Sequence, residues 1–201
     1  MSNHQPISPR FIIALVLSIV CLTSSTCADI EPPVDTSKNN RAEYEATAKE
    51  LHKSAGEGNA SAQNGLGLLY NEGAGVPQDY RQAKEWFEKA AKQGHAGAQV
   101  NLGTLYLHGD GTPQSAQMAL FWFSLAAEQE DALAFAKLGL MYAQGQGVLQ
   151  DFIQAHKCYN LSAAYGEQRA ATARDALAQK MAPAQIAEAQ RLAREWKPKG
   201  K

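Results

Sequence analysis

The sequence predicts an all-α protein built from helical hairpins that stack side by side. Three observations predict it. The 201 residues are rich in Ala and only 8% aromatic, which favours helices that approach each other closely. A 36-residue pattern recurs three times without a gap, and each copy contains two segments of helical periodicity separated by Gly and Pro.

The charge of the chain is nearly balanced. It has 19 Lys and Arg against 20 Asp and Glu, a formal net charge of −1, and no run of basic residues. Because binding to phosphate backbones needs concentrated positive charge, nucleic-acid partners are not expected.

The N-terminus has the organisation of a secretory signal peptide, which we place at residues 1–28. Arg10 is the only Lys or Arg before Lys38, and it directly precedes an apolar run over residues 11–22. A transmembrane anchor is the alternative, but this run of 12 residues is shorter than the ~20 needed to span a bilayer. We therefore expect export to a periplasm or secretion, with no membrane attachment once the signal is removed.

Cleavage after Ala28 would place small residues at the positions that signal cleavage requires. Lipid attachment at Cys27 is the alternative, but residues 24–26 match poorly the sequence expected before the cysteine of a bacterial lipoprotein. Cleavage leaves Cys158 as the only cysteine, so no internal disulfide can form. Residues 29–40, with Pro32 and Pro33, are expected to form a flexible leader.

Residues 59–166 contain the three copies, at 59–94, 95–130 and 131–166. Ala62, Leu66, Gly67, Tyr70 and Gly73 recur 36 and 72 residues later. In the first predicted helix of each copy, Ala62 and Leu66 belong to an apolar stripe along one side. Gly67 costs roughly 1 kcal/mol in a helix interior, which is plausible only where a neighbouring helix needs the space.

The second predicted helix of each copy follows a glycine turn. Gly73 and Gly75 end the first helix, and Asp79 is placed to accept hydrogen bonds from the free N–H groups at the start of the second. Ser115 and Asp151 occupy the same position in the later copies.

One hairpin buries too few large side chains to offset the entropy of ordering 36 residues, so the copies should fold only as an array. Residues 41–58 have the register of a leading half-repeat. Residues 167–201 predict a capping pair, with one helix over about 167–180 and a second that begins at Pro183.

The pattern A-x-x-x-L-G-x-x-Y-x-x-G-x-G-V-x-x-D-x-x-x-A-x-x-W-x-x-x-A-A-x-x-G, read from Ala62 to Gly94, resembles the Sel-one-like repeat (SLR), a relative of the tetratricopeptide repeat. The resemblance implies a right-handed α/α superhelix, or solenoid, that serves as a scaffold for protein partners. Many relatives are exported bacterial proteins, among them envelope adaptors and antitoxin-like partners of secreted effectors.

The later copies depart from this pattern at four positions. Thr112 and Ser115 replace Val and Asp, and Glu130 replaces the Gly found at 94 and 166, so the second helix of the middle copy is expected to end differently. Cys158 replaces the Trp of the first two copies, which predicts a looser junction or one that the cap covers.

The resemblance also implies where a partner binds, because the first helix of each pair lines the concave face of tetratricopeptide arrays. A helical wheel places residues 64, 68 and 71 on the side of the first helix opposite its apolar stripe. The alternative, that the cap or neighbouring helices cover the apolar members of this set, stays open. The predicted concave-face residues are Asn64, Leu68, Asn71, Glu72, Val100, Thr104, Leu107, His108, Ala136, Leu140, Ala143 and Gln144.

We find no motif for catalysis, a metal or a cofactor. The histidines are scattered, and His156 and Cys158 lie two residues apart on different sides of a helix, which disfavours a Cys/His nucleophile. No G-x-S-x-G or S-x-x-K sequence is present.

The prediction is therefore an exported, non-enzymatic scaffold, in a bacterial periplasm, that binds another protein through the concave face of its repeats. The pattern does not specify the partner. An immunity or inhibitor protein for a secreted toxin is the alternative, and a hydrolase is a remote one.

Overall fold

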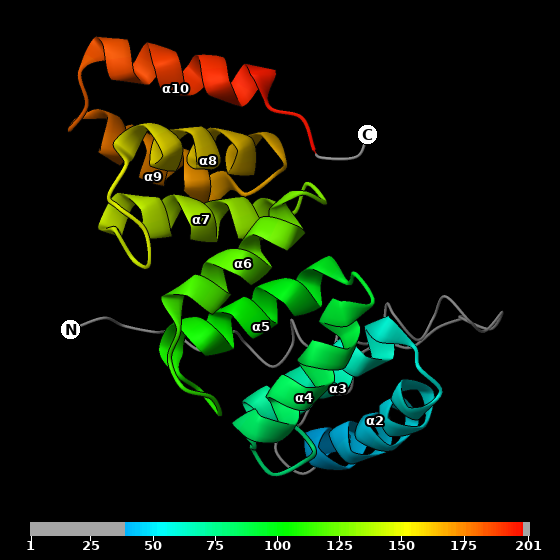
Figure 1. Ribbon diagram of the computed structural model, residues 1–201. Coiled ribbons are helices and arrows are strands. Elements are labelled where there is room, and N and C mark those ends of the chain that lie inside the picture. The colour runs from blue at the N-terminus through cyan, green and yellow to red at the C-terminus, as the bar shows by residue number, and fades with distance from the viewer. Residues whose placement is uncertain (1–38, 199–201) are drawn as a thin grey trace, which may run out of the picture.

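The computed structural model describes residues 39–198, and these form nine helices and no strands (Figure 1). The helices are stacked from α2 at one end to α10 at the other. Their bounds are α2 (Asn39–Gly56), α3 (Ala60–Glu72), α4 (Tyr80–Lys92), α5 (Ala96–His108), α6 (Ala116–Ala127), α7 (Ala132–Gln144), α8 (Phe152–Ala164), α9 (Gln168–Ala178) and α10 (Pro183–Glu195). The prediction of an all-α repeat array is confirmed.

The predicted signal peptide, the cysteine considered for lipid attachment and the first ten residues of the leader lie outside the described residues. The other two leader residues, Asn39 and Asn40, belong to α2, which begins two residues before the half-repeat expected from the sequence. None of helices α2–α10 combines the length and apolar character needed to cross a membrane.

Packing follows the order of the chain. Within each copy, α3 packs on α4, α5 on α6 and α7 on α8. Each second helix also packs on the first helix of the next copy, α2 packs on α3, and α10 returns to pack on α8. The core is therefore continuous along the array, as expected for hairpins that cannot fold alone.

The two helices of each copy meet at a glycine. A Cβ atom on Gly103 would lie 2.7 Å from a ring carbon of Phe123, which is fully buried. The matching pairs are Gly67 with Phe87 at 2.6 Å and Gly139 with Tyr159 at 2.8 Å. The expectation that the in-helix glycine makes room for a neighbouring helix is confirmed.

A second glycine brings consecutive copies together. Gly111 has a positive φ of 64°, and a Cβ there would lie 2.5 Å from the carbonyl carbon of Tyr80, at the start of α4. Gly75 stands in the same relation to Tyr44 of α2. Since Tyr44 and Tyr80 are 36 residues apart, α2 takes the place of a second helix from a preceding repeat.

The second helix of the middle copy ends differently from its counterparts, as expected, but by one residue only. Glu130 adopts a φ of 64°, in the left-handed region where Gly94 and Gly166 have 88° and 108°. The N–H of Asp131 donates to Ala126 O, as the N–H of the equivalent His95 donates to the carbonyl of Ala90. The turn is thus retained, although α6 ends one residue before the position at which α4 and α8 end. Packing against the next copy stabilises this turn enough to offset the steric cost of a side chain at positive φ.

The C-terminal end of the array replaces polar contacts with aromatic ones. Gln93 Nε2 donates to Gln63 Oε1 at 2.7 Å, and the equivalent pair Gln129–Gln99 bonds at 2.9 Å. In the third copy the same two positions hold Phe135 and Tyr165, whose rings stack at 5.7 Å, and Trp196 packs edge-on against Phe135 at 5.1 Å. The residues after α10 therefore close this junction with apolar surface.

Every first helix of the repeats begins at a side-chain cap, and so does every second helix. Asp79, Ser115 and Asp151 accept backbone N–H groups at the starts of α4, α6 and α8, as predicted. The caps of α3, α5 and α7 are Asn59, His95 and Asp131.

We expect Gly103→Ala to destabilise the protein by about 1–3 kcal/mol, because the new methyl group overlaps the Phe123 ring. Phe123→Leu should lower the free energy of unfolding less in the Gly103→Ala background than in the wild type. Urea unfolding of the single and double variants measures this coupling. Gly56→Ala is the control, since nothing lies within 4 Å of the added atom. Additive effects of the two substitutions would contradict the assignment of this contact.

His95 should make stability fall in mild acid. Burial lowers the pKa of His95, and its ring Nδ1 must stay unprotonated to accept the Ala98 N–H at 3.1 Å. The unfolded chain then binds the proton more readily, so stability is complete above about pH 6.5 and falls as the pH drops below it. His95→Asn introduces the residue type that caps α3. It should reduce the loss of stability in acid and leave stability at pH 8 nearly unchanged. Melting curves at pH 8 and pH 5 test this, and an equal loss in both proteins would contradict it.

Candidate functional site

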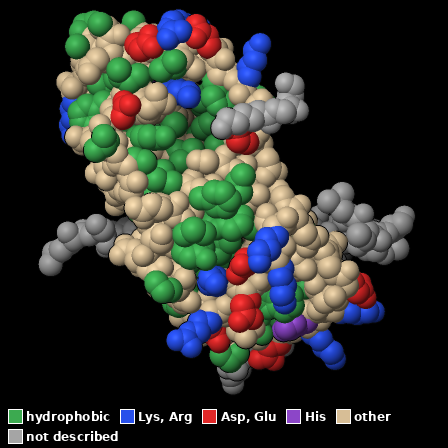
Figure 2. Space-filling model, in the orientation of Figure 1, with side chains coloured by type: hydrophobic (Ala, Val, Ile, Leu, Met, Phe, Trp, Pro, Cys, Tyr) green, Lys and Arg blue, Asp and Glu red, His purple; other side chains and the backbone are tan. Residues whose placement is uncertain are grey.

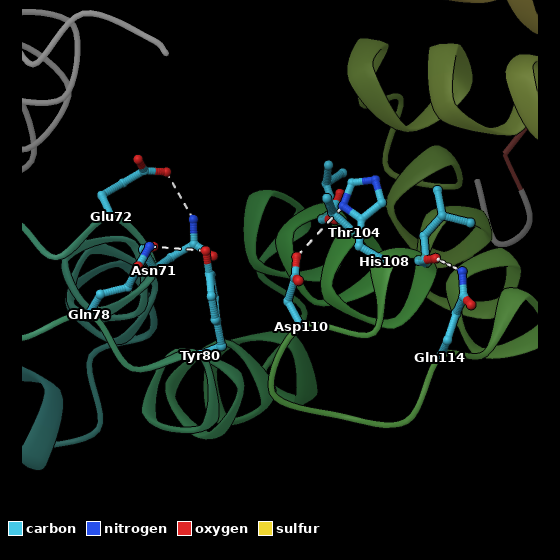
Figure 3. A network of polar contacts seen from close by, with 10 residues as sticks. Asn71, Glu72, Gln78, Tyr80, Thr104, His108, Asp110 and Gln114 are labelled. Atoms are coloured by element: carbon cyan, nitrogen blue, oxygen red, sulfur yellow. Dashed lines mark hydrogen bonds and ion pairs between the residues drawn. The ribbon is translucent and has the colours of Figure 1, made fainter. Parts of the chain in front are cut away.

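The strongest candidate for a binding site is a hollow of about 180 Å³ between the first and second copies. Helices α3, α4 and α5 and the turn after α5 supply its lining, much of which is labelled in Figure 3. We call this feature the hollow. It is lined by Asn71, Tyr80, Phe87, Asn101, Thr104, Leu105, His108 and Asp110.

The hollow combines an apolar base with polar walls. Phe87 and Leu105 are only 1% and 3% exposed, so they close it towards the core. The other six lining residues carry amide, hydroxyl, imidazole or carboxylate groups. A few convergent polar groups over an apolar base are typical of a binding pocket.

Local hydrogen bonds hold the polar groups in place. Asn101 Nδ2 donates to Asn64 Oδ1 at 3.0 Å, across the junction between copies. Asn71 Nδ2 donates to Glu72 Oε1 at 2.9 Å. The Thr104 hydroxyl donates to the Val100 carbonyl at 2.9 Å, which leaves the lone pairs of its oxygen available to a ligand.

The turn after each first helix is held by a glutamine. Gln78 Nε2 donates to Asn71 O at 2.8 Å and to the Tyr80 hydroxyl oxygen at 3.0 Å (Figure 3). Gln114 and Gln150 donate to the equivalent carbonyls, both at 2.7 Å. Since this bond recurs in all three copies, it belongs to the scaffold, whereas the contact with Tyr80 is specific to the hollow.

Charge at the hollow is mixed. His108 Nδ1 lies 3.8 Å from Asp110 Oδ2, and the two side chains are 55% and 41% exposed. This pair is ionic only when His108 is protonated. The rim of the hollow can therefore offer a carboxylate and an imidazole to a ligand.

The structure brings three of the twelve predicted residues together in the hollow, namely Asn71, Thr104 and His108. Seven of the other nine lie along the same face of α3, α5 and α7 as these three. We call it the first-helix face. Of the seven, Glu72, Leu140 and Gln144 are exposed, and Leu68, Leu107, Ala136 and Ala143 are partly buried. Whether this set binds a partner remains a prediction.

Two predicted residues are not accessible. Val100 is 3% exposed and belongs to the core cluster that joins the second and third copies, so its placement on an open face is wrong. Asn64 is 6% exposed and is hydrogen-bonded to Asn101. A helical wheel considers one helix alone, whereas the next repeat packs over these two positions. For Val100 the alternative, that neighbouring helices cover it, is correct.

Sequence reasoning missed three polar residues of the hollow: Tyr80, Asn101 and Asp110. A signal was present, because each differs from its counterparts in the other copies. Asn101 replaces Gly65 and Lys137, for example. Comparing the copies would have marked these three positions as variable, but it would not have shown that they come together in a hollow.

Cys158, the only cysteine among the described residues, is not placed to act as a nucleophile. Cys158 is 5% exposed, and burial raises the pKa of its thiol to about 12, so it stays protonated at neutral pH and is a poor nucleophile. Within residues 39–198 no group of three His, Cys, Asp or Glu side chains could hold a metal ion. What the hollow can do is accept and donate hydrogen bonds.

A second surface feature lies on α6. Met118, Phe121 and Leu125 are 37%, 52% and 37% exposed and share one side of the helix. Figure 2 shows hydrophobic side chains gathered over the middle of the array, where α6 lies in Figure 1. We call these three residues the α6 stripe. Their counterparts in the first copy are Gln82, Glu85 and Lys89.

The chain resembles known proteins both in its repeat family and in its structure. A family profile described as the Sel1 repeat matches residues 60–95, 96–131 and 132–166. These are the three copies found from the sequence, with every boundary except the end at 166 shifted by one residue. No curated protein matches the chain.

Two solved structures resemble it over most of its length. A Sel1 repeat protein from Oxalobacter formigenes is 31% identical in sequence, with a TM-score of 0.62. The match covers 78% of this chain and 56% of the Oxalobacter chain. The protein c5321 from uropathogenic Escherichia coli, described as a protective antigen with an SLR fold, is 34% identical with a TM-score of 0.71, covering 75% of this chain and 32% of its own. The chain thus matches only part of each.

A third structure, immunity protein Pa5087 from Pseudomonas aeruginosa, is 20% identical with a TM-score of 0.38, covering 84% of this chain and 71% of its own. At that distance it supports no inference about function.

Proposed function

Because the chain belongs to the Sel1 repeat family, we propose that it is an exported, non-enzymatic scaffold that binds a partner protein through its first-helix face. Sel1 repeat proteins are generally scaffolds for protein interactions. The family does not specify which partner this chain binds, which face it uses or in which compartment it acts, so these parts are our proposal.

The observation that carries the proposal is the hollow. The scaffold residues of the array repeat from copy to copy, but the polar lining of the hollow does not. His108, for example, replaces Glu72 and Gln144. Polar side chains that the fold does not require, gathered over an apolar base, are suited to recognising a ligand.

Export rests on the N-terminal sequence, with its apolar run over residues 11–22 after Arg10. In that compartment a fold with Cys158 as its single thiol would be stabilised by packing alone, and the buried position of this thiol protects it from oxidation.

A substitution pair on each surface tests which face binds. We expect His108→Glu with Leu140→Glu, on the first-helix face, to weaken capture of the partner by at least tenfold. The matched control is Phe121→Glu with Leu125→Glu on the α6 stripe, which should leave capture unchanged. All four side chains are more than a third exposed, so both variants should melt near the wild type.

The measurement is quantitative capture of crosslinked partner from envelope extract by the tagged protein. Loss of capture with the α6 pair, and retention with the first-helix pair, would contradict the proposal and assign binding to the α6 stripe.

Export has its own test. Intact mass and N-terminal sequencing of the protein from the periplasmic or secreted fraction should give a chain that begins at Asp29. A protein that retains residues 1–28, stays in the cytoplasm or carries lipid on Cys27 would contradict this part of the proposal.

A further inference from the structure

Lys137, in the middle of α7, is a cation without a counter-charge. It is partly exposed, and no hydrogen bond or ion pair reaches it from the described residues. Burial alone lowers the pKa of Lys137, and no neighbouring charge contributes. Since burying an unpaired ammonium group costs free energy, the fold gains nothing electrostatic from this side chain.

The 36-residue register shows what surrounds it. Lys137 is the counterpart of Asn101, which bonds to Asn64 on the preceding first helix. The counterpart of Asn64 is Val100, which is buried and offers no polar side chain. By this register, the position across the junction from Lys137 is apolar, whereas the previous copy has a pair of amides there.

The neighbouring hollow supplies complementary groups. The side-chain oxygens of Asn71, Asn101 and Thr104 can each accept a hydrogen bond, so this part of the hollow suits the N–H groups of an extended backbone. Glu72 and Asp110 add negative charge here and disfavour an acidic side chain. Lys137, the only Lys or Arg in α3, α5 and α7, lies one repeat further along.

We propose that the first-helix face binds an extended segment of the partner whose backbone lies in the hollow and whose Asp or Glu side chain pairs with Lys137. This inference rests on the proposed function. Lys137 lies one repeat beyond the hollow, on α7, and an extended chain advances about 3.3 Å per residue. The acidic residue therefore lies several positions from the residue held in the hollow, at one fixed spacing.

The source of the carboxylate is a side chain within the segment. Lys137 lies at an internal junction of the array, and α9 continues the stack beyond α7. A segment can thus pass Lys137 and continue, so a free carboxyl terminus is not required there.

The test uses nonapeptides that are acetylated and amidated, so that side chains are their only carboxylates. Peptides selected from a random library on the purified protein should carry Asp or Glu at one fixed position. Lys137→Met should weaken a selected peptide roughly 10- to 100-fold, as should Asp→Asn in the peptide. The two changes together should cost no more than either alone. Lys49→Met, at an exposed site on α2, is the matched loss of charge and should bind normally.

Thermal unfolding separates binding from folding. Because Lys137 is unpaired, Lys137→Met should leave the melting temperature unchanged or raise it. Weaker binding accompanied by a lower melting temperature would assign Lys137 a structural role and contradict the inference.

Other outcomes distinguish this inference from the proposed function. Selected peptides that need no acidic residue, or that bind Lys137→Met as tightly as wild type, overturn the role of Lys137 alone, provided that His108→Glu with Leu140→Glu still abolishes their binding. Binding only by peptides with a free carboxyl terminus also overturns it. If no peptide is enriched, or if the first-helix pair has no effect, the proposed function fails as well.

Discussion

The fold depends on the contact between a glycine in each first helix and an aromatic ring in the second. At Gly103 the ring of Phe123 occupies the space of a missing side chain. This contact sets how closely the two helices of a copy approach, and its recurrence every 36 residues gives the hairpins the same geometry. A second glycine contact, between Gly111 and the start of α4, then sets the position of each copy on the one before.

With geometry fixed by the repeated residues, the non-repeated residues are free to vary. Tyr80, Asn101 and His108 build the hollow where other copies have small, apolar or differently charged side chains. In the third copy, Phe135 and Tyr165 replace a hydrogen-bonded glutamine pair, and Trp196 packs against both rings. The same backbone therefore provides a binding hollow near one end and a closed junction near the other.

Much of the fold could be predicted from the sequence, because the helical period, the glycine turns and the caps are local signals. Gly67 was interpreted correctly as a close contact, since a glycine that recurs inside a helix needs a packing reason. Contacts between copies were harder. Val100 looked available on a wheel but is buried by the next copy, and the Asn64–Asn101 bond joins residues 37 apart. No motif or single-helix pattern encodes such pairs, so the hollow could not be found without the structure. Glu130 shows the converse, a local preference overridden by the stacking of the next copy.

The central claim is that the first-helix face is the working surface of this array. Hydrogen–deuterium exchange on the protein with and without its bound partner tests it most directly. The account predicts slower exchange on binding at the ends of α3 and α5 and the start of α4 around the hollow, and along α7, with α6 and α8 unchanged. Protection confined to α6 and its neighbouring second helices would contradict it.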